Sequence, residues 1–144
     1  MSSILPLNLP IMAQPNNLLA IDVGASRIGL ARASVVARLP EPLVTLKNDG
    51  FFVANIKKVI ADQQIDTLIV GLPRNMQGRE TDQSKYVREF CDNTLKQLNL
   101  PIIMQDETLS TVKAEEWLKR SNYKKASLDS VSAVIILEDY LNPV

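Results

Sequence analysis

The sequence predicts an α/β fold: a mixed five-stranded sheet with helices on both faces. Two observations lead to this class. Short apolar runs typical of strands alternate with longer segments whose apolar residues recur at the helical period. Three predicted strands come first, a helix precedes each of the last two strands, and two more helices end the chain. A strand reached through a helix normally lies parallel to the strand before it, so the sheet is expected to be mixed.

The first part of the chain is typical of three strands and a helix. Residues 18–23 are a short apolar run, and residues 27–33 follow after a Gly-Ala-Ser turn. Two apolar runs joined by so tight a turn predict a β-hairpin. A third strand is expected at residues 41–48. Residues 50–64 carry apolar side chains at positions 52, 53, 56, 59 and 60, which is the spacing of an amphipathic helix.

The second part alternates strands with helices. Residues 66–72 form a continuous apolar run of β-branched character, which is typical of a strand buried on both faces. After a polar loop, a helix is expected around residues 80–98 and a strand at 101–107, parallel to the strand before it. Two helices, at residues 110–121 and 127–141, are expected to complete the fold.

Length and charge limit the organisation and the partners. The 144 residues are expected to form one domain, residues 18–144, after a flexible uncharged tail, residues 1–17, with three prolines. Sixteen basic and sixteen acidic residues create no global basic field, although a local basic patch can still steer a polyanion. The tail lacks the basic start and unbroken apolar centre of a secretory signal, and no apolar run spans a membrane. We expect a cytoplasmic protein without a membrane partner, either a monomer or a homodimer.

The residue types exclude several kinds of site. Cys91 is the one cysteine, so a disulfide framework and a Cys-rich metal site are excluded, and its helical context predicts a small core residue. The sequence has no histidine, which removes Ser-His-Asp and Cys-His nucleophiles and His-rich zinc sites. Catalysis must therefore come from carboxylates, amines, hydroxyls or a metal held by oxygen.

Three acidic residues lie beside apolar residues in three different elements. Asp22 ends the first strand and Gly24 follows it, which fits either a local Asx turn or an acid offered to a phosphate or metal. Glu107 ends the strand at 101–107, on the same face as Ile103 and Gln105, and is either a polar strand end or a site residue. Asp129 lies in the first turn of the last helix, where a negative charge suits the helix dipole.

The position of Asp129 also favours a role in a site. Residues 129, 133, 136 and 140 lie on one stripe of the helix, and the other three are Ala133, Ile136 and Tyr140. The carboxylate is therefore expected to face the sheet, where a charge needs a partner. If the three acids converge, such an oxygen-rich cluster suits Mg²⁺ or Mn²⁺, which assist attack of water on a phosphodiester. The sequence predicts order and facing, not distance.

Four motifs occur in the order and spacing of one family. "IDVGASRIGLA" resembles an opening Asp-x-Gly-x-x-Arg-Ile-Gly-x-Ala strand and hairpin, and "IVGLPRNMQGRETDQS" resembles a Gly-Leu-Pro-x-Asn-x-x-Gly loop. "QDETLST" resembles an Asp-Glu-Arg-x-(Ser/Thr)-Thr segment, and "LDSVSAVIILEDYL" resembles a final Asp-containing helix. Together they cover residues 18–141 and resemble the YqgF family, described as Holliday-junction resolvases or pre-16S ribosomal RNA nucleases. One motif is weak, but four together are specific.

The resemblance implies a ribonuclease H-like fold related to the RuvC resolvases. It also implies that Asp22, Glu107 and Asp129 are the catalytic, metal-binding acids and that the substrate is pre-ribosomal RNA rather than branched DNA. The chain departs from the family pattern at Thr108, where the family has an arginine that would help hold phosphate or the neighbouring acids. Ser132, where the family usually has alanine, is a minor change.

Polar residues around the predicted site are candidates for binding nucleic acid. Those on loops or strand starts are Arg27, Arg74, Asn75 and Arg79. A second cluster surrounds Tyr123 and consists of Lys119, Arg120, Lys124 and Lys125. Basic side chains around one aromatic ring are typical of a loop that contacts the nucleic-acid backbone and stacks one base, but also of a solvated helix end.

The leading hypothesis is a Mg²⁺- or Mn²⁺-dependent nuclease that matures the 5′ end of pre-16S ribosomal RNA. The alternatives are a Holliday-junction-type DNA resolvase and a non-catalytic nucleic-acid-binding module on the same fold; Thr108 and the neutral charge favour the latter. An actin- or Hsp70-like nucleotide site also opens with Asp-x-Gly after an apolar strand, but 144 residues hardly supply the two lobes it needs.

Overall fold

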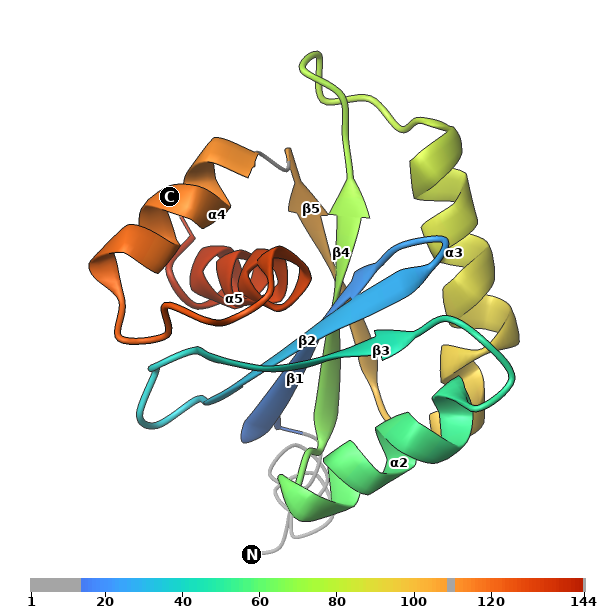
Figure 1. The fold of residues 1–144 in the computed structure, drawn as a ribbon. Helices are drawn as coiled ribbons and strands as arrows, with labels where there is room; N and C mark the ends of the chain where they lie inside the picture. The colour runs from blue at the N-terminus through green and yellow to red at the C-terminus, as the bar shows by residue number, and fades with distance from the viewer. Residues whose placement is uncertain (1–13, 109–110, 144) are drawn as a thin grey trace, which may run out of the picture.

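The computed structural model describes residues 14–108 and 111–143 and confirms the predicted α/β class (Figure 1). Residues 1–13 of the predicted tail lie outside the described residues. Within the described part, five strands form one sheet in the order β3-β2-β1-β4-β5. The strands are β1 Asn17–Val23, β2 Arg27–Ser34, β3 Glu41–Lys47, β4 Thr67–Pro73 and β5 Ile102–Glu107. The helices are α2 Phe52–Asp62, α3 Asp82–Asn93, the 3₁₀ helix η1 Leu95–Leu98, α4 Thr111–Arg120 and α5 Leu128–Leu141.

The strand pairing confirms the predicted mixed sheet. β1 and β2 form the expected antiparallel hairpin, and β3 adds to it antiparallel. β4 pairs parallel with β1, and β5 pairs parallel with β4, as expected for strands reached through helices. Asp22 and Glu107 therefore lie at the carboxyl ends of two parallel strands, β1 and β5, on either side of β4.

Side chains of each strand alternate between two cores, one on each face of the sheet. In β1, Leu19 and Ile21 face the core that α2 and α3 cover. Leu18 and Ala20 face the other core, which α5 covers. Figure 1 shows α2 and α3 on one side of the sheet and α4 and α5 on the other. The two-sided covering explains why β4 is apolar at nearly every position.

Helix α5 is buried on almost every side because the sheet and α4 both pack against it. Ser127 caps its start, since the Ser127 hydroxyl accepts a hydrogen bond from the Ser130 backbone N–H at 3.1 Å. The predicted stripe is confirmed: Ala133 and Ile136 are fully buried against the sheet. Asp129, on the same stripe, is thus directed to the sheet.

The predicted helix at 80–98 is shorter in the structure and ends in a 3₁₀ turn. It begins after Thr81, whose hydroxyl accepts from the Ser84 backbone N–H while the Ser84 hydroxyl accepts from the Thr81 backbone N–H. The α-helix ends at Asn93, and η1 continues to Leu98. Asn99 then takes a left-handed conformation with φ of 55°, which ends the helical segment.

The first described residues are tied to the start of β4. The backbone N–H groups of Asn16 and Asn17 donate to the two carboxylate oxygens of Asp66 at 3.0 and 2.8 Å. The sheet therefore begins at Asn17, one residue before the predicted strand. Cys91 is buried in the α3 core, as predicted. In the part of the chain that the structure describes, no helix is long and apolar enough to cross a membrane.

Candidate active site

The structure directs the three predicted acids to the same face of the sheet, the face that α5 covers. Asp22 shares its face of β1 with Leu18 and Ala20, which pack against α5. Glu107 shares its face of β5 with Ile103, which also packs against α5. Asp129 belongs to α5 itself. The facing predicted for Asp129, toward the sheet, and the face predicted for Glu107, shared with Ile103, are those of the fold.

A glycine in β2 allows Asp129 to approach Asp22. Gly29 is the direct cross-strand partner of Asp22. A Cβ atom at Gly29 would lie 2.0 Å from the carbonyl oxygen of Asp129 and 2.8 Å from the backbone nitrogen of Ser130. Any larger residue would push the first turn of α5 away from the sheet. The small residue in the hairpin thus sets the place where α5 begins, above the end of β1.

The environment of Asp22 disfavours its charge. Burial, followed by the nearby charge of Asp129, raises the pKa of Asp22 from 3.8 to about 6. A buried acid beside a second acid is costly to ionise unless a cation is bound between or beside them. The pair is therefore suited to hold a positive charge.

Arg27 is the cation that contacts one member of this pair, Asp129. Its Nε donates to Oδ2 of Asp129 at 2.8 Å, and 67% of its side chain is exposed to solvent. The hydrogen bond to Asp129 raises the pKa of Arg27. Arg27 therefore orients Asp129 while it keeps most of its surface available to a ligand.

A short turn connects Asp22 to Arg27. The Gly24 backbone N–H donates to the Arg27 carbonyl oxygen at 3.0 Å, and a Cβ atom at Gly24 would lie 2.6 Å from that oxygen. The side-chain amide of Asn48 donates to the Gly24 carbonyl oxygen and to the Tyr86 hydroxyl, both at 3.0 Å. The turn after Asp22 is thus closed by its own backbone and held from the β3–α2 loop and from α3.

Glu107 has partners that the sequence analysis did not predict. Only 4% of Glu107 is exposed, and it lies with Asp139 in a pocket of about 400 Å³ between β5, α4 and the end of α5. Burial is the largest cause that raises the pKa of Glu107, to about 9, followed by a side-chain hydrogen bond to Asp139 and the charge of that residue. The charge of Lys113 lowers the pKa of Glu107, and Asp22 contributes a further small rise. When protonated, Glu107 donates this bond to the Asp139 carboxylate.

Asp139 gave one signal in the sequence, although that signal was weak. It lies three residues after Ile136, and residues three apart on a helix are neighbours on its surface. An acid near the end of a helix is usually solvated, so the pattern alone did not distinguish it. Its contacts come from β5 and α4, which are distant in the sequence.

The donor set fits a hard divalent cation, but the acids lie in two pairs. Asp22 and Asp129 repel each other at one end, and Glu107 contacts Asp139 at the other. Carboxylate oxygens are the ligands that Mg²⁺ and Mn²⁺ prefer. Among residues 14–108 and 111–143, no three acids are close enough to form a ready-made metal site. Ligation by all three predicted acids would require the Glu107 side chain to move toward Asp22.

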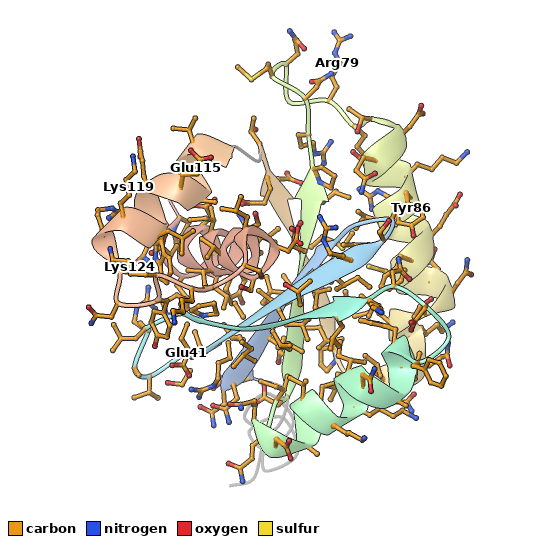
Figure 2. The ribbon with its side chains drawn as sticks, viewed as in Figure 1. Glu41, Arg79, Tyr86, Glu115, Lys119 and Lys124 are labelled. Carbon is orange, nitrogen blue, oxygen red and sulfur yellow. The ribbon has the colours of Figure 1, made fainter. Side chains whose placement is uncertain are left out.

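The loop after β4 carries three of the predicted nucleic-acid-binding residues. Arg74 is held by the chain itself, with its Nε donating to Asp106 at 3.2 Å and its Nη1 lying 3.7 Å from Glu80. The Asn75 side-chain oxygen accepts from the Arg79 backbone N–H at 2.9 Å, so Asn75 shapes the loop. Arg79 is exposed, and Figure 2 shows it at the far end of this loop.

The cluster around Tyr123 has mixed roles. The Lys124 ammonium donates to the Leu118 carbonyl oxygen at 3.0 Å and to that of Lys119, so Lys124 caps α4. Tyr123 stacks on Trp117, with ring centres 5.9 Å apart. Two further basic residues of the cluster are exposed: Lys119 and Arg120. Figure 2 shows Lys119 and Lys124 on the α4 side of the molecule.

A second pocket lies beside the start of α5. It measures about 320 Å³ and is lined by residues of β3, of the α4–α5 loop and of the first turn of α5, including Tyr123, Lys125 and Ser127. The Ser127 hydroxyl lies 2.6 Å from that of Thr45, which links the loop to β3. Lys125 thus lines a pocket beside the first turn of α5, close in the chain to Asp129.

The departure at Thr108 leaves an exposed hydroxyl on the pocket that contains Glu107. The cation that faces Glu107 in the structure is instead Lys113, from α4. Positive charge is therefore present beside Glu107, although it comes from a residue that the motif does not include.

Comparison with known proteins identifies the family. A family described as "RuvX: Holliday junction resolvase" matches residues 16–143. The chain belongs to the RuvX family. This confirms the resemblance to the YqgF family, which is the same family under its other name.

Curated relatives in the RuvX family are similar along almost their whole length. A Chloroflexus aurantiacus protein is 37% identical over 131 residues, which is 87% of this chain and 86% of the relative. A Clostridium botulinum protein is 37% identical over 132 residues, which is 87% of this chain and 96% of the relative. Both relatives carry the name "Putative pre-16S rRNA nuclease".

Solved structures show that the RuvX-family chain has a ribonuclease H-like fold. The RuvC of T. thermophilus in complex with a Holliday junction substrate aligns over 87% of this chain and 93% of its own, with a TM-score of 0.59 and 15% identity. A second T. thermophilus RuvC structure aligns over the same shares of the two chains, with a TM-score of 0.56 and 11% identity. The expected fold is confirmed.

Proposed function

We propose that this chain is a divalent-metal-dependent nuclease that hydrolyses phosphodiester bonds of pre-16S ribosomal RNA near its 5′ end. The observation that carries the proposal is the pair of neighbouring acids at the end of β1, the largely buried Asp22 and the partly exposed Asp129, in a chain of the RuvX family. The names of the relatives support the choice of RNA over branched DNA. This substrate implies action in the cytoplasm.

The acids have separate roles in this proposal. Asp22 and Asp129 hold Mg²⁺ or Mn²⁺ from the β1 and α5 sides, and Glu107 completes the site from β5. When bound, such an ion stabilises the charge that develops on the attacking and leaving oxygens of a phosphodiester. Arg27 keeps Asp129 in place and offers its exposed surface to a neighbouring phosphate.

The exposed basic residues support a path for the nucleic-acid strand. Arg27 and the pocket that contains Lys125 both lie at the start of α5, so they can bind the backbone on one side of the acids. Arg79 extends the interface to the loop after β4. Three of the predicted binding residues form hydrogen bonds within the chain: Arg74, Asn75 and Lys124. These bonds support a role in positioning the loops rather than in binding nucleic acid directly.

The decisive experiment is cleavage by the Asp22→Asn variant with Mg²⁺. The substrates are a precursor RNA that contains the 5′ end of 16S ribosomal RNA and a four-way DNA junction. We expect wild type to cleave the RNA and the variant to be slower by about a hundredfold or more, because one preorganised charge at the reacting centre is lost. Asp62→Asn is the matched control, because Asp62 is an exposed acid at the end of α2.

The results separate the alternatives. An Asp22→Asn variant that cuts as fast as wild type would show that the assigned site is wrong. Cleavage of the DNA junction alone would favour a resolvase. Absence of cleavage, together with no Mn²⁺ binding in calorimetric titration up to millimolar concentration, would favour a non-catalytic binding module. Among the described residues, Glu107 does not form a group with the other two acids, and this observation favours testing the non-catalytic alternative as well.

A further inference from the structure

The pocket that contains Glu107 lies at the opposite end of α5 from Asp129. The lining residues are Gln105, Asp106, Glu107, Thr108, Lys113, Asp139, Asn142 and Pro143. Asp129 and Asp139 are ten residues apart on one helix, which separates their Cα atoms by about 15 Å. A carboxyl group that contacts Asp139 is therefore too far from Asp129 to share a metal ion with it, because each metal–oxygen bond is only about 2 Å long.

The contact between Glu107 and Asp139 is supported from a third element. The Nζ atom of Lys113, on α4, lies 3.5 and 3.4 Å from the two carboxylate oxygens of Asp139. Asp139 is partly exposed, whereas Glu107 is 4% exposed. Asp139 is thus fixed by α4 on one side and faces the buried Glu107 side chain, which lines the same pocket, on the other.

We propose that Asp139, fixed by Lys113, is a positioning residue that keeps the Glu107 carboxyl at the α4 end of the pocket. This inference rests on the proposed function, because it assumes that Glu107 joins Asp22 and Asp129 when metal binds. Asp139 then competes with the metal ion for Glu107. The affinity of the site for a metal ion then depends on the contact of Asp139 on α5 with Glu107 on β5 as well as on the ligands themselves.

The test is the affinity for Mn²⁺ alone, measured by calorimetric titration at one pH. In Asp139→Ala the competing contact is absent, and we expect Mn²⁺ to bind about tenfold tighter than to wild type, the range of one hydrogen bond to a charged group. Asp139→Leu removes the same contact but fills the volume, and it should give the same gain. Agreement between the two variants excludes an effect of the cavity left by alanine.

A matched control removes one acid from α4 without touching the pocket. Glu115 is exposed on this helix (Figure 2), and Glu115→Gln should bind Mn²⁺ as wild type does. The concentration of Mn²⁺ that gives half-maximal cleavage should fall in Asp139→Ala, while the rate at saturating Mn²⁺ stays that of wild type. A merely structural role for Asp139 would lower that rate and leave the metal affinity unchanged.

The possible outcomes separate this inference from the proposed function. Wild type that binds Mn²⁺, with equal or weaker binding by Asp139→Ala and Asp139→Leu, would overturn the inference and leave the proposed function intact. Tighter binding by both variants, together with full activity of Asp22→Asn, would support the inference and overturn the assigned catalytic role of Asp22. No Mn²⁺ binding by any variant would overturn both.

Discussion

At the scale of single residues, the site depends on the absence of a side chain at Gly29. This glycine is opposite Asp22 in the hairpin and beneath the first turn of α5. The contact joins β2 to Asp129, which is one hundred residues later in the chain. The sequence contained the glycine within a recognisable turn motif, but only the fold reveals that it makes room for a helix.

Gly29→Ala is therefore expected to damage both stability and activity. The added Cβ would overlap the backbone of Asp129 at 2.0 Å, so α5 must shift. Overpacking of this kind costs about 1–3 kcal/mol of unfolding free energy, measured by urea denaturation. The shift also displaces Asp129 and should lower Mg²⁺-dependent cleavage at least tenfold. Gly50→Ala is the control, because a Cβ at Gly50 meets no atom within 4 Å. Equal stability of the two variants would contradict this account.

The residues of the site differ in how well the sequence could predict them. The facing of Glu107 and of Asp129 was predictable, because strand alternation and the helical stripe determine which way each carboxylate faces. Asp139 and Lys113 were not, because their contact joins α4 to α5 and neither residue belongs to an apolar pattern. A sequence shows which residues are charged, but only the fold shows what each charged group contacts. Lys124, for example, caps α4, although the basic residues near it in the sequence are exposed.

At the scale of elements, the turn between β1 and β2 is supported from two other parts of the fold, the loop after β3 and helix α3. The Asn48 side chain, after β3, donates to Gly24 and to Tyr86 of α3, and the Gln83 amide of α3 donates to the Val23 carbonyl oxygen at 3.2 Å. The turn itself was predictable from its small residues. Its supports were not, since they come from polar side chains in a loop and a helix whose positions only the packing decides.

Asn48→Ala tests this support. The variant loses two hydrogen bonds from one amide group, so we expect about 1–3 kcal/mol less unfolding free energy in urea denaturation. Tyr86→Phe removes the bond to the Tyr86 hydroxyl alone and isolates its share. If the two variants lose the same free energy, the bond to Gly24 contributes nothing and the turn does not depend on Asn48.

The elements themselves were predicted well where one simple rule governs them. The hairpin, the parallel strands and α5 have the expected bounds within one or two residues. The helix expected at 80–98 was predicted less well: a capping box at Thr81 and a left-handed Asn99 limit the segment, and the α-helix changes to the 3₁₀ helix η1 after Asn93. Such local hydrogen bonds override the apolar period at the ends of a helix.

At the scale of the whole molecule, a neutral net charge conceals an uneven distribution. The two acids with raised pKa that belong to the proposed site, Asp22 and Glu107, both lie on the α5 face of the sheet. Arg27 forms its ion pair with Asp129 and Lys113 forms its ion pair with Asp139, so neither cation is dedicated to Asp22 or Glu107. This face therefore has a shortage of positive charge, which the divalent ion of the proposed function would relieve.

The shortage predicts how stability depends on pH without metal. The pKa of Asp22 is raised to about 6 and that of Glu107 to about 9, so the folded state keeps protons that the unfolded state releases from about pH 4 upward. Stability is therefore highest below the unfolded pKa values and is lost as pH rises toward 9. In thermal unfolding with a chelator, we expect Tm to fall by several degrees between pH 5 and pH 9, roughly the effect of 1–2 kcal/mol.

Two comparisons decide whether these acids cause the fall. Glu107→Gln removes the group with the larger shift and should flatten the upper part of the profile, whereas Glu115→Gln, an exposed acid, should keep the wild-type slope. Mn²⁺ binds the deprotonated carboxylates and stabilises the folded state by mass action, so its effect on Tm should grow with pH. A Tm that is constant from pH 5 to pH 9 in wild type, or a Mn²⁺ effect that shrinks over this range, would contradict the assignment of Asp22 and Glu107 as buried acids that need a cation.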